Sequence, residues 1–314
     1  MADKMHSKTF KTLDEQVEIL QSKGLIIDDV EYVRNILLRE NYFFISGYRH
    51  LFLKSAREKL YITGTNFREL YAMFYFDRQV RNIIFKNILI VENNMKSIFS
   101  YQLSKKYGYQ EKNYLNEANF NNTAEKKRQL NDLLKKMKRQ IRVNGGQHTA
   151  TMHYLNSYGY IPMWVVVKVL SFGIVSELYT VMKPVDQDEI AEIFKIEKNS
   201  LLNYLPILAN YRNLCAHEDI LYDNRTQRVI TDTKYHYKLN VPLMDGEYIY
   251  GKNDLFALVI ILKQILDQEN FTLLINELTY EIELLSGKLK SITIDKVLDK
   301  MGLPENYKEI MRVD

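Results

Sequence analysis

The sequence predicts an almost entirely α-helical fold, and three observations support this prediction. The chain has only 12 glycines and 5 prolines among 314 residues, fewer than a loop-rich β protein usually has. Helix-start patterns recur along the chain, and apolar residues follow them at helical spacing. About 46% of the residues are hydrophobic and 26% are charged, which is typical of a globular chain that can bury a large core.

The first 60 residues predict two helices and a connector. Thr12-Leu13-Asp14-Glu15 is a capping box that opens a helix ending at Gly24. Asp28 is expected to cap the second helix. The aromatic run at residues 42–49 is interpreted as a short, bent connector. We place a soft boundary near residue 60 and treat residues 1–60 as an N-terminal helical segment.

The longest helix is expected in the next segment. Asn66-Phe67-Arg68-Glu69 is a second capping signal. Neither proline nor glycine interrupts the helical pattern from there to Gly108. A helix of this length is unusual in a globular protein, so a break inside it would not be surprising. Residues 123–143 predict a further helix, which ends at Gly145-Gly146.

Three helices are expected between Pro162 and His217. Pro162 fits the first position of a helix. The side chains that this helix is expected to bury are Trp164, Val167, Leu170 and Ile174. Residues 186–196 form a short amphipathic pattern. The third helix begins at Ser200 or at Pro206, because proline is tolerated in a first turn but kinks a longer helix.

The pattern changes after His217. Residues 228–237 and 248–251 are rich in Thr, Tyr, Val and Ile, and Asp245-Gly246 is a hairpin-turn signal. We therefore expect a small β-hairpin near residues 228–251. Asn253 is expected to cap one long helix to about residue 286, and a short helix follows Thr293. Residues 61–286 thus form the main helical body, and residues 287–314 form a helical tail.

Charge and cysteine content restrict the class of protein. The net charge is +4 and the pI is about 8.7, which is mildly basic and identifies no partner. Cys215 is the single cysteine, so no intrachain disulfide can form, and a reducing cytoplasm fits. Residues 1–10 lack the apolar core of a signal peptide, and charges interrupt the longest apolar runs. We expect a cytoplasmic protein without a membrane span.

One short segment could carry chemistry: Tyr211-Arg212-Asn213-Leu214-Cys215-Ala216-His217. Arg212 and His217 are separated by about 140° around an ideal helix, whereas Asn213 and His217 share a face. Asn213 can therefore orient the imidazole or hold the same phosphate. One copy of the segment makes a poor clamp around a phosphate, but two facing copies make a good one. The spacing therefore favours a homodimer with a composite site.

These residue types suit metal-free RNA cleavage. The ribose 2′-OH attacks the neighbouring phosphate, and histidine can act as the base or the acid near neutral pH. A guanidinium stabilises the charge of the phosphorane. The products are a 2′,3′-cyclic phosphate and a 5′-OH. In the alternative interpretation, His217 caps the helix end, and Cys215 and Ala216 are ordinary core residues.

Several segments resemble the HEPN ribonuclease motif as it appears in Abi-like (abortive infection, AbiD/AbiF type) proteins. The resemblance covers about residues 9–286, and each segment is weak alone, but their order and joint presence are fairly specific. The first is the Arg212–His217 segment followed by Leu221-Tyr222-Asp223-Asn224-Arg225. The others are Leu13-Asp14-Glu15-Gln16-Val17 through Leu25-Ile26-Ile27, Tyr42-Phe43-Phe44-Ile45-Ser46-Gly47-Tyr48, Phe76-Asp77-Arg78-Gln79-Val80-Arg81, and Pro162-Met163-Trp164 through Ser171-Phe172-Gly173.

The resemblance implies a HEPN-like helical bundle, phage defence, metal-independent RNA cleavage and dimerisation through the motif helices. It also implies kinship to CRISPR RNA-targeting nucleases of the HEPN type. Arg212 and His217 take the catalytic roles, and Asn213 orients them. One departure is Lys168, which stands where members of the family often carry an acid. Glu92 and Glu177 are the alternatives for that acidic group.

Three further sets of residues have two interpretations each. Asp77, Arg78 and Arg81 can meet on one helix surface, either as an internal salt-bridge network or with Arg78 and Arg81 contacting RNA phosphates. The basic helix can track an RNA backbone or present a solvated face; its candidate RNA-binding residues are Lys135, Lys138, Arg139 and Arg142. The tyrosines nearby can stack on bases or pack in the core; they are Tyr107, Tyr109 and Tyr114.

Three functions compete at this point. The leading hypothesis is a metal-independent endoribonuclease that acts as the toxin of a phage-defence or toxin–antitoxin system, restrained by an RNA or protein antitoxin. The second is a non-catalytic RNA-binding module, and the third is an interaction protein of a defence complex. No cofactor is expected, and the metal site suggested by His148 and His153 is weak, because no Cys partner or closer His spacing accompanies them.

Overall fold

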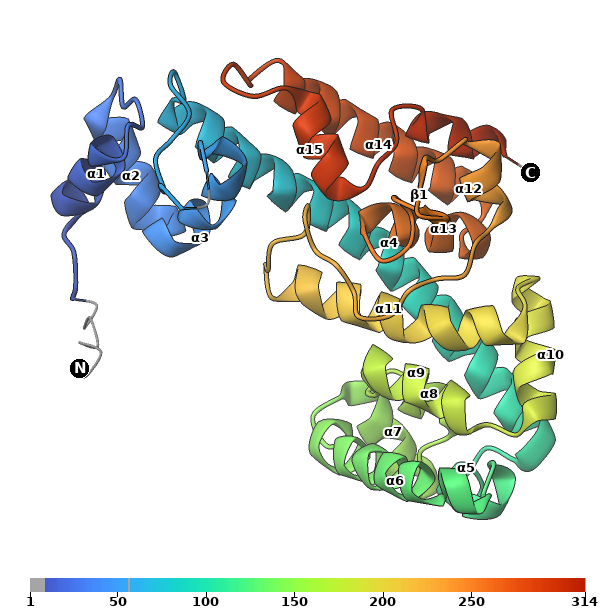
Figure 1. The fold of residues 1–314 in the computed structure, drawn as a ribbon. Coiled ribbons are helices and arrows are strands. Elements are labelled where there is room, and N and C mark those ends of the chain that lie inside the picture. Colours follow the sequence, from blue (N-terminus) through green and yellow to red (C-terminus); the bar gives the residue numbers. More distant parts are fainter. Residues whose placement is uncertain (1–8, 56, 314) are drawn as a thin grey trace, which may run out of the picture.

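Helix α4 (Phe67–Tyr107) is the central element of the fold. The computed structural model describes residues 9–55 and 57–313. Figure 1 shows α4 crossing the molecule, with α1–α3 at its N-terminal end and α5–α9 near its C-terminal end. Helices α11 and α13–α15 lie along its length (Figure 1). The fold is mainly helical with one small hairpin, which confirms the predicted class.

Four short helical elements form the N-terminal end: α1 (Leu13–Ser22), α2 (Val30–Glu40), α3 (Tyr42–Ser46) and the 3₁₀ helix η1 (Gly47–Phe52). The predicted capping box of Thr12 and Glu15 is present. The predicted cap of α2 is wrong by one residue, because Asp29 accepts the hydrogen bond from the Tyr32 N–H. Asp28 instead pairs with Arg68 of α4, at 3.1 Å.

The aromatic run at residues 42–49 is helical rather than a bent connector. Asn41, at a φ of 66°, turns the chain between α2 and α3. Its side-chain oxygen then accepts a hydrogen bond from the Phe43 N–H and starts the new helix.

Helix α4 runs for 41 residues without a break, although its length had left room for one. Asn66 and Glu69 form the predicted capping box. Buried side chains occur along the whole length of α4, from Phe67 to Leu103, because other helices pack against it at both ends and in the middle. This packing, rather than helix propensity, supplies most of the stability of α4.

The segment after α4 contains more breaks than the sequence predicts. Its elements are α5 (Glu111–Tyr114), η2 (Glu117–Asn119), α6 (Ala124–Gly145), α7 (Thr149–Tyr158), α8 (Met163–Val166) and α9 (Phe172–Val181). The single helix expected from Pro162 is two, because Ser171 caps a new helix at Phe172. Val167, Leu170 and Ile174 are buried as predicted, but Trp164 is 47% exposed.

Helix α10 (Pro184–Phe194) leads into α11 (Lys198–Ala216), which carries the candidate motif. Helix α11 begins earlier than either predicted start, because Glu197 caps it by accepting a hydrogen bond from the Ser200 N–H. Pro206 therefore lies inside the helix.

The predicted hairpin is present but small. It consists of β1 (Leu243–Met244) and β2 (Glu247–Tyr248), paired antiparallel. Asp245 and Gly246 form its turn, both with positive φ, as a tight hairpin turn requires. Residues 228–237 add no strand; their last part enters the short helix α12 (Lys234–Lys238), which Thr233 caps.

The C-terminal elements are α13 (Leu255–Ile265), α14 (Gln268–Ser286), α15 (Ile294–Met301) and η3 (Tyr307–Arg312). The one long helix expected from Asn253 is two, because Asp254 caps α13 and Asp267 caps α14. The last helix after Thr293 is confirmed.

Both terminal segments contact α4. Ile26 donates a backbone hydrogen bond to Thr65, just before α4 begins. The Glu69 carboxylate accepts hydrogen bonds from the Lys290 and Ser291 N–H groups, at 2.6 and 2.7 Å. The division at residues 60 and 286 stays a prediction. Within residues 9–55 and 57–313, none of the helices combines the length and apolar character needed to cross a bilayer.

Candidate active site

Arg212 of α11 faces α4 and contacts a buried carboxylate. Its Nε lies 3.4 Å from an oxygen of Glu92, and its guanidinium carbon lies 5.7 Å from the centre of the Phe85 ring. Glu92 also accepts a hydrogen bond from Lys96, at 2.6 Å. The three charged groups carry a net positive charge, and the Arg212 side chain remains 32% exposed. The guanidinium is therefore held in place and still open to an anion.

Glu92 is the acid that contacts the motif. The other alternative, Glu177, lies on α9 and pairs with Lys136 of α6 at 2.7 Å. Lys168, the departure from the family pattern, is exposed in the turn between α8 and α9. The acid that steadies Arg212 thus comes from α4.

His217 ends α11. Ala216 is the last helical residue, and the His217 N–H donates a hydrogen bond to the Asn213 carbonyl, at 3.0 Å. The His217 and Asn213 side chains are both exposed. In the described part of the chain, neither side chain makes a hydrogen bond or an ion pair. One chain therefore does not join Arg212, Asn213 and His217 through side-chain contacts.

The loop after His217 is fixed by Asp77 of α4. The buried Asp77 carboxylate accepts hydrogen bonds from the N–H groups of Leu221 and Tyr222, at 3.1 and 2.8 Å. It also accepts one from the Tyr48 hydroxyl, at 2.7 Å. Tyr48 stacks on Tyr222, with the ring centres 5.8 Å apart. One carboxylate thus connects η1, α4 and the segment that follows the motif histidine.

Arg81 belongs to this internal network. Its side chain is 3% exposed and forms an ion pair with Asp77. It also donates hydrogen bonds to the Tyr48 hydroxyl, at 2.9 Å, and to the Asp219 carbonyl, at 3.3 Å. The structure therefore favours the salt-bridge interpretation for Arg81, because a buried and paired guanidinium does not face an RNA phosphate.

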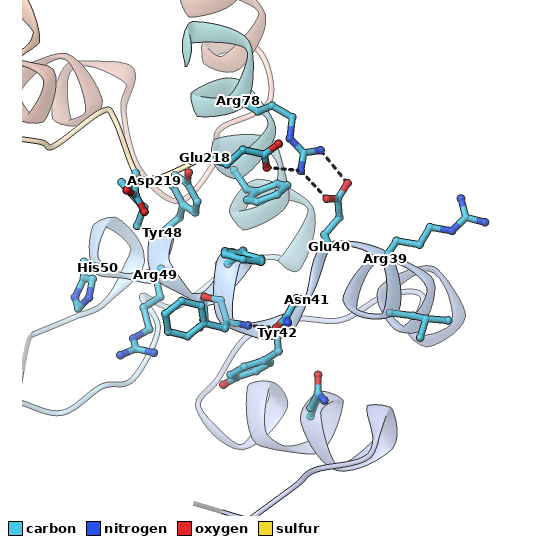
Figure 2. Close-up of a pocket in the computed structure, with 18 of the residues that line it drawn as sticks. Arg39, Glu40, Asn41, Tyr42, Tyr48, Arg49, His50, Arg78, Glu218 and Asp219 are labelled. Atoms are coloured by element: carbon cyan, nitrogen blue, oxygen red, sulfur yellow. Dashed lines mark hydrogen bonds and ion pairs between the residues drawn. The ribbon is translucent and has the colours of Figure 1, made fainter. Parts of the chain in front are cut away.

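Arg78 is neither fully buried in the internal network nor free for RNA. Figure 2 shows its guanidinium paired with Glu40 of α2, at 2.7 Å, and near Glu218, at 3.8 Å. It also lies over the Phe74 ring, 4.7 Å from the ring centre. Its side chain is partly exposed. A phosphate contact at Arg78 would compete with the Glu40 carboxylate.

The basic helix is α6. Its apolar side chains, among them Leu130 and Met137, are buried, and α6 packs against α9. The four candidate cations on the opposite side are exposed, and no ion pair joins them to the described residues; they are Lys135, Lys138, Arg139 and Arg142. This cationic face of α6 is available to a polyanion, and its RNA contact remains a prediction.

The nearby tyrosines divide between core and surface. Tyr107 donates a hydrogen bond to Asp186, and the buried Tyr114 donates one to the Ile161 carbonyl. Tyr109 is exposed at the surface and lies 5.2 Å from Trp164, measured between ring centres. Among the residues that the structure describes, no group of three His, Cys, Asp or Glu side chains could hold a metal ion.

Cys215 lies within the motif but is only 8% exposed. Burial raises the pKa of its thiol to about 12. The thiol is therefore protonated at neutral pH, and Cys215 does not act as a nucleophile. Cys215 acts as a packing residue between Arg212 and His217.

The chain was compared with models of known protein families. The model of the Abi-like protein family matches residues 35–223, well over half of the chain. The matched range includes α3, α4, α6, α11 and the loop bound by Asp77. The family's description points to abortive infection, a form of phage defence. Comparisons with curated proteins and with solved structures give no match.

Replacing Asp77 tests the network that fixes the loop after His217. Asp77→Ala leaves the buried Arg81 charge unpaired and two backbone N–H groups without an acceptor. We expect the free energy of unfolding, measured by urea denaturation, to fall by about 3–5 kcal/mol. Glu277→Ala is the control, because it breaks only an exposed pair with Lys86 and should cost less than about 1 kcal/mol. Equal losses in the two variants would contradict this role of Asp77.

Thiol reactivity tests the buried state of the motif. We expect iodoacetamide at pH 7.5 to leave Cys215 unmodified in the native protein and to alkylate it in urea, because the native thiol is protonated and inaccessible. Intact-mass spectrometry measures the modification. Rapid alkylation of the folded protein would show that the end of α11 is more open than described.

Proposed function

Because the chain belongs to the Abi-like protein family, we propose that it is a metal-independent endoribonuclease of a phage-defence system. The observation that supports this most directly is the arrangement at the end of α11. Arg212 is steadied by the buried Glu92, and the exposed His217 follows at the end of the same helix. These are a phosphate-binding group and a proton-transfer group on one rigid element.

The proposed reaction uses the ribose 2′-OH as the nucleophile. The base takes the 2′-OH proton, a bond forms between the 2′-oxygen and phosphorus, and the bond to the 5′-oxygen breaks. The acid gives a proton to the leaving 5′-oxygen, which yields a 2′,3′-cyclic phosphate and a 5′-OH. His217 would act as base or acid, and Arg212 would stabilise the phosphorane charge. Asn213 would orient the phosphate.

A homodimer would complete this site. One copy supplies a single motif histidine, whereas the reaction needs both a base and an acid. Asn213, Ala216 and His217 are exposed at the end of α11 and are therefore free to face a second copy. Pairing the two α11 ends would place two histidines and two arginines around one phosphate.

We propose two kinds of partner, the RNA substrate and an antitoxin. The cationic face of α6 would bind the RNA backbone, with Arg78 as an additional contact. Restraint in a healthy cell would come from an RNA or protein antitoxin. A non-catalytic RNA-binding module is the second candidate, and the exposed cations of α6 favour it as well.

Cleavage of total RNA and tRNA in EDTA tests the lead function. We expect the purified protein to yield cyclic-phosphate ends, and His217→Ala and Arg212→Ala to lower the rate by at least about 10²-fold, because each removes a group used in the transition state. His153→Ala is the matched control, since His153 is also exposed but lies on α7. Retained cleavage in His217→Ala would contradict the proposed mechanism. RNA binding without cleavage by the unsubstituted protein would favour the non-catalytic RNA-binding module.

The salt dependence of binding tests the cationic face of α6. In a His217→Ala background, Lys138→Ala/Arg139→Ala should weaken binding of single-stranded RNA. The slope of log affinity against log salt concentration should become shallower by about 0.7 for each lost phosphate contact. Fluorescence anisotropy at several salt concentrations measures the slope. Lys86→Ala, at an exposed but paired lysine of α4, should leave it unchanged; an unchanged slope in the α6 variant would remove this face from the RNA interface.

A further inference from the structure

A large groove lies beside the motif loop, between the N-terminal helices and the beginning of α4. Its volume is about 1480 Å³, more than a single small-molecule site normally encloses. Figure 2 shows many of its lining residues; the walls come from the segment before α1, from α1, α2, α3, η1 and α4, and from the loop after α11. We call it the aromatic groove, and its principal residues are Arg39, Tyr42, Phe43, Phe44, Arg49 and Asp219.

The aromatic groove begins next to the candidate catalytic histidine. Glu218, Asp219 and Ile220 line it, and they follow His217 directly in the chain. The groove lining therefore begins at the residue after His217. The hydrogen bonds from Leu221 and Tyr222 to Asp77 fix this wall in place.

Two aromatic rings in the groove are exposed to solvent instead of being packed in the core. Phe43 is 75% exposed and Phe44 is 51% exposed. Their ring centres are 5.7 Å apart in an edge-to-face arrangement. Adjacent exposed phenylalanines are a departure from ordinary surface composition and indicate a binding surface. Their flat faces suit stacking with nucleobases, which every base can make.

Unpaired cations lie at both ends of the groove. Figure 2 shows Arg49 and His50 at one end and Arg39 at the other, where its side chain extends outward. Neither Arg39 nor Arg49 forms an ion pair with another described residue. The groove also contains carboxylates, those of Glu40, Glu218 and Asp219, but the lysine and arginine side chains that line it outnumber them. Such a position favours an anionic ligand.

We propose that the aromatic groove holds the single-stranded nucleotides of the RNA substrate that flank the cleaved phosphate. Bases stack on Phe43 and Phe44, and the guanidinium groups of Arg49 and Arg39 contact phosphates. The groove thereby selects unpaired RNA, because bases in a duplex are already stacked and cannot lie on the two rings. This inference rests on the proposed function, since the same RNA must reach His217.

Binding of a labelled single-stranded RNA 12-mer to the His217→Ala protein tests the groove without cleavage. Phe43→Ala/Phe44→Ala should weaken binding by about tenfold or more, given the usual contribution of base stacking. Phe43→Tyr/Phe44→Tyr keeps both rings and should bind as the parent does. Arg49→Ala should make the salt dependence of binding shallower. Tyr280→Ala, which removes an exposed ring on α14, is the matched control and should have no effect.

The outcomes separate the groove from the proposed chemistry. If the chain with native His217 cleaves RNA but Phe43→Ala/Phe44→Ala binds the 12-mer as Tyr280→Ala does, the groove proposal is overturned and the chemistry stands. If the chain with native His217 does not cleave but the phenylalanine variant loses RNA binding, the groove stands and the chemistry fails. Absence of RNA binding by the His217→Ala protein would overturn the groove proposal.

Discussion

The buried carboxylate of Asp77 is the interaction on which the arrangement of the site depends. It accepts hydrogen bonds from a hydroxyl of η1 and from two backbone N–H groups of the loop after His217, and it pairs with Arg81 one helical turn away. A buried carboxylate is tolerated only when such partners satisfy it. The same bonds that satisfy Asp77 therefore fix the loop that follows the motif and one wall of the aromatic groove.

A second buried acid orients the motif itself. Glu92 lies on the same helix as Asp77, about four turns further along, and contacts Arg212 and Lys96. Helix α4 therefore carries both carboxylates that hold the site. Glu92 contacts the arginine of the motif, and Asp77 accepts the hydrogen bonds of the loop beyond its histidine. Such a scaffold must be rigid, and an unbroken, heavily buried helix provides that rigidity.

The open side of the site contrasts with this fixed side. Asn213 and His217 face solvent at the end of α11, and the cations of α6 are also exposed. Arg212 is held against α4, while His217 has no side-chain partner within the described residues. This division is the basis of the proposal that a second copy of the chain and RNA complete the site. The aromatic groove begins at Glu218, just beyond this histidine in the chain, and follows the N-terminal helices.

Sequence alone determined the helical class, the starts of α1, α4, α6 and α15, and the position of the motif, because caps and apolar spacing depend on residues a few positions apart. Tertiary structure alone decided which acid contacts Arg212, since Glu92 lies 120 positions away in the chain. It also decided that Arg81 is internal, that Trp164 is exposed, and that the helices expected from Pro162 and Asn253 are each divided. Charge pairing and burial depend on which helices pack together, and no local pattern contains that information.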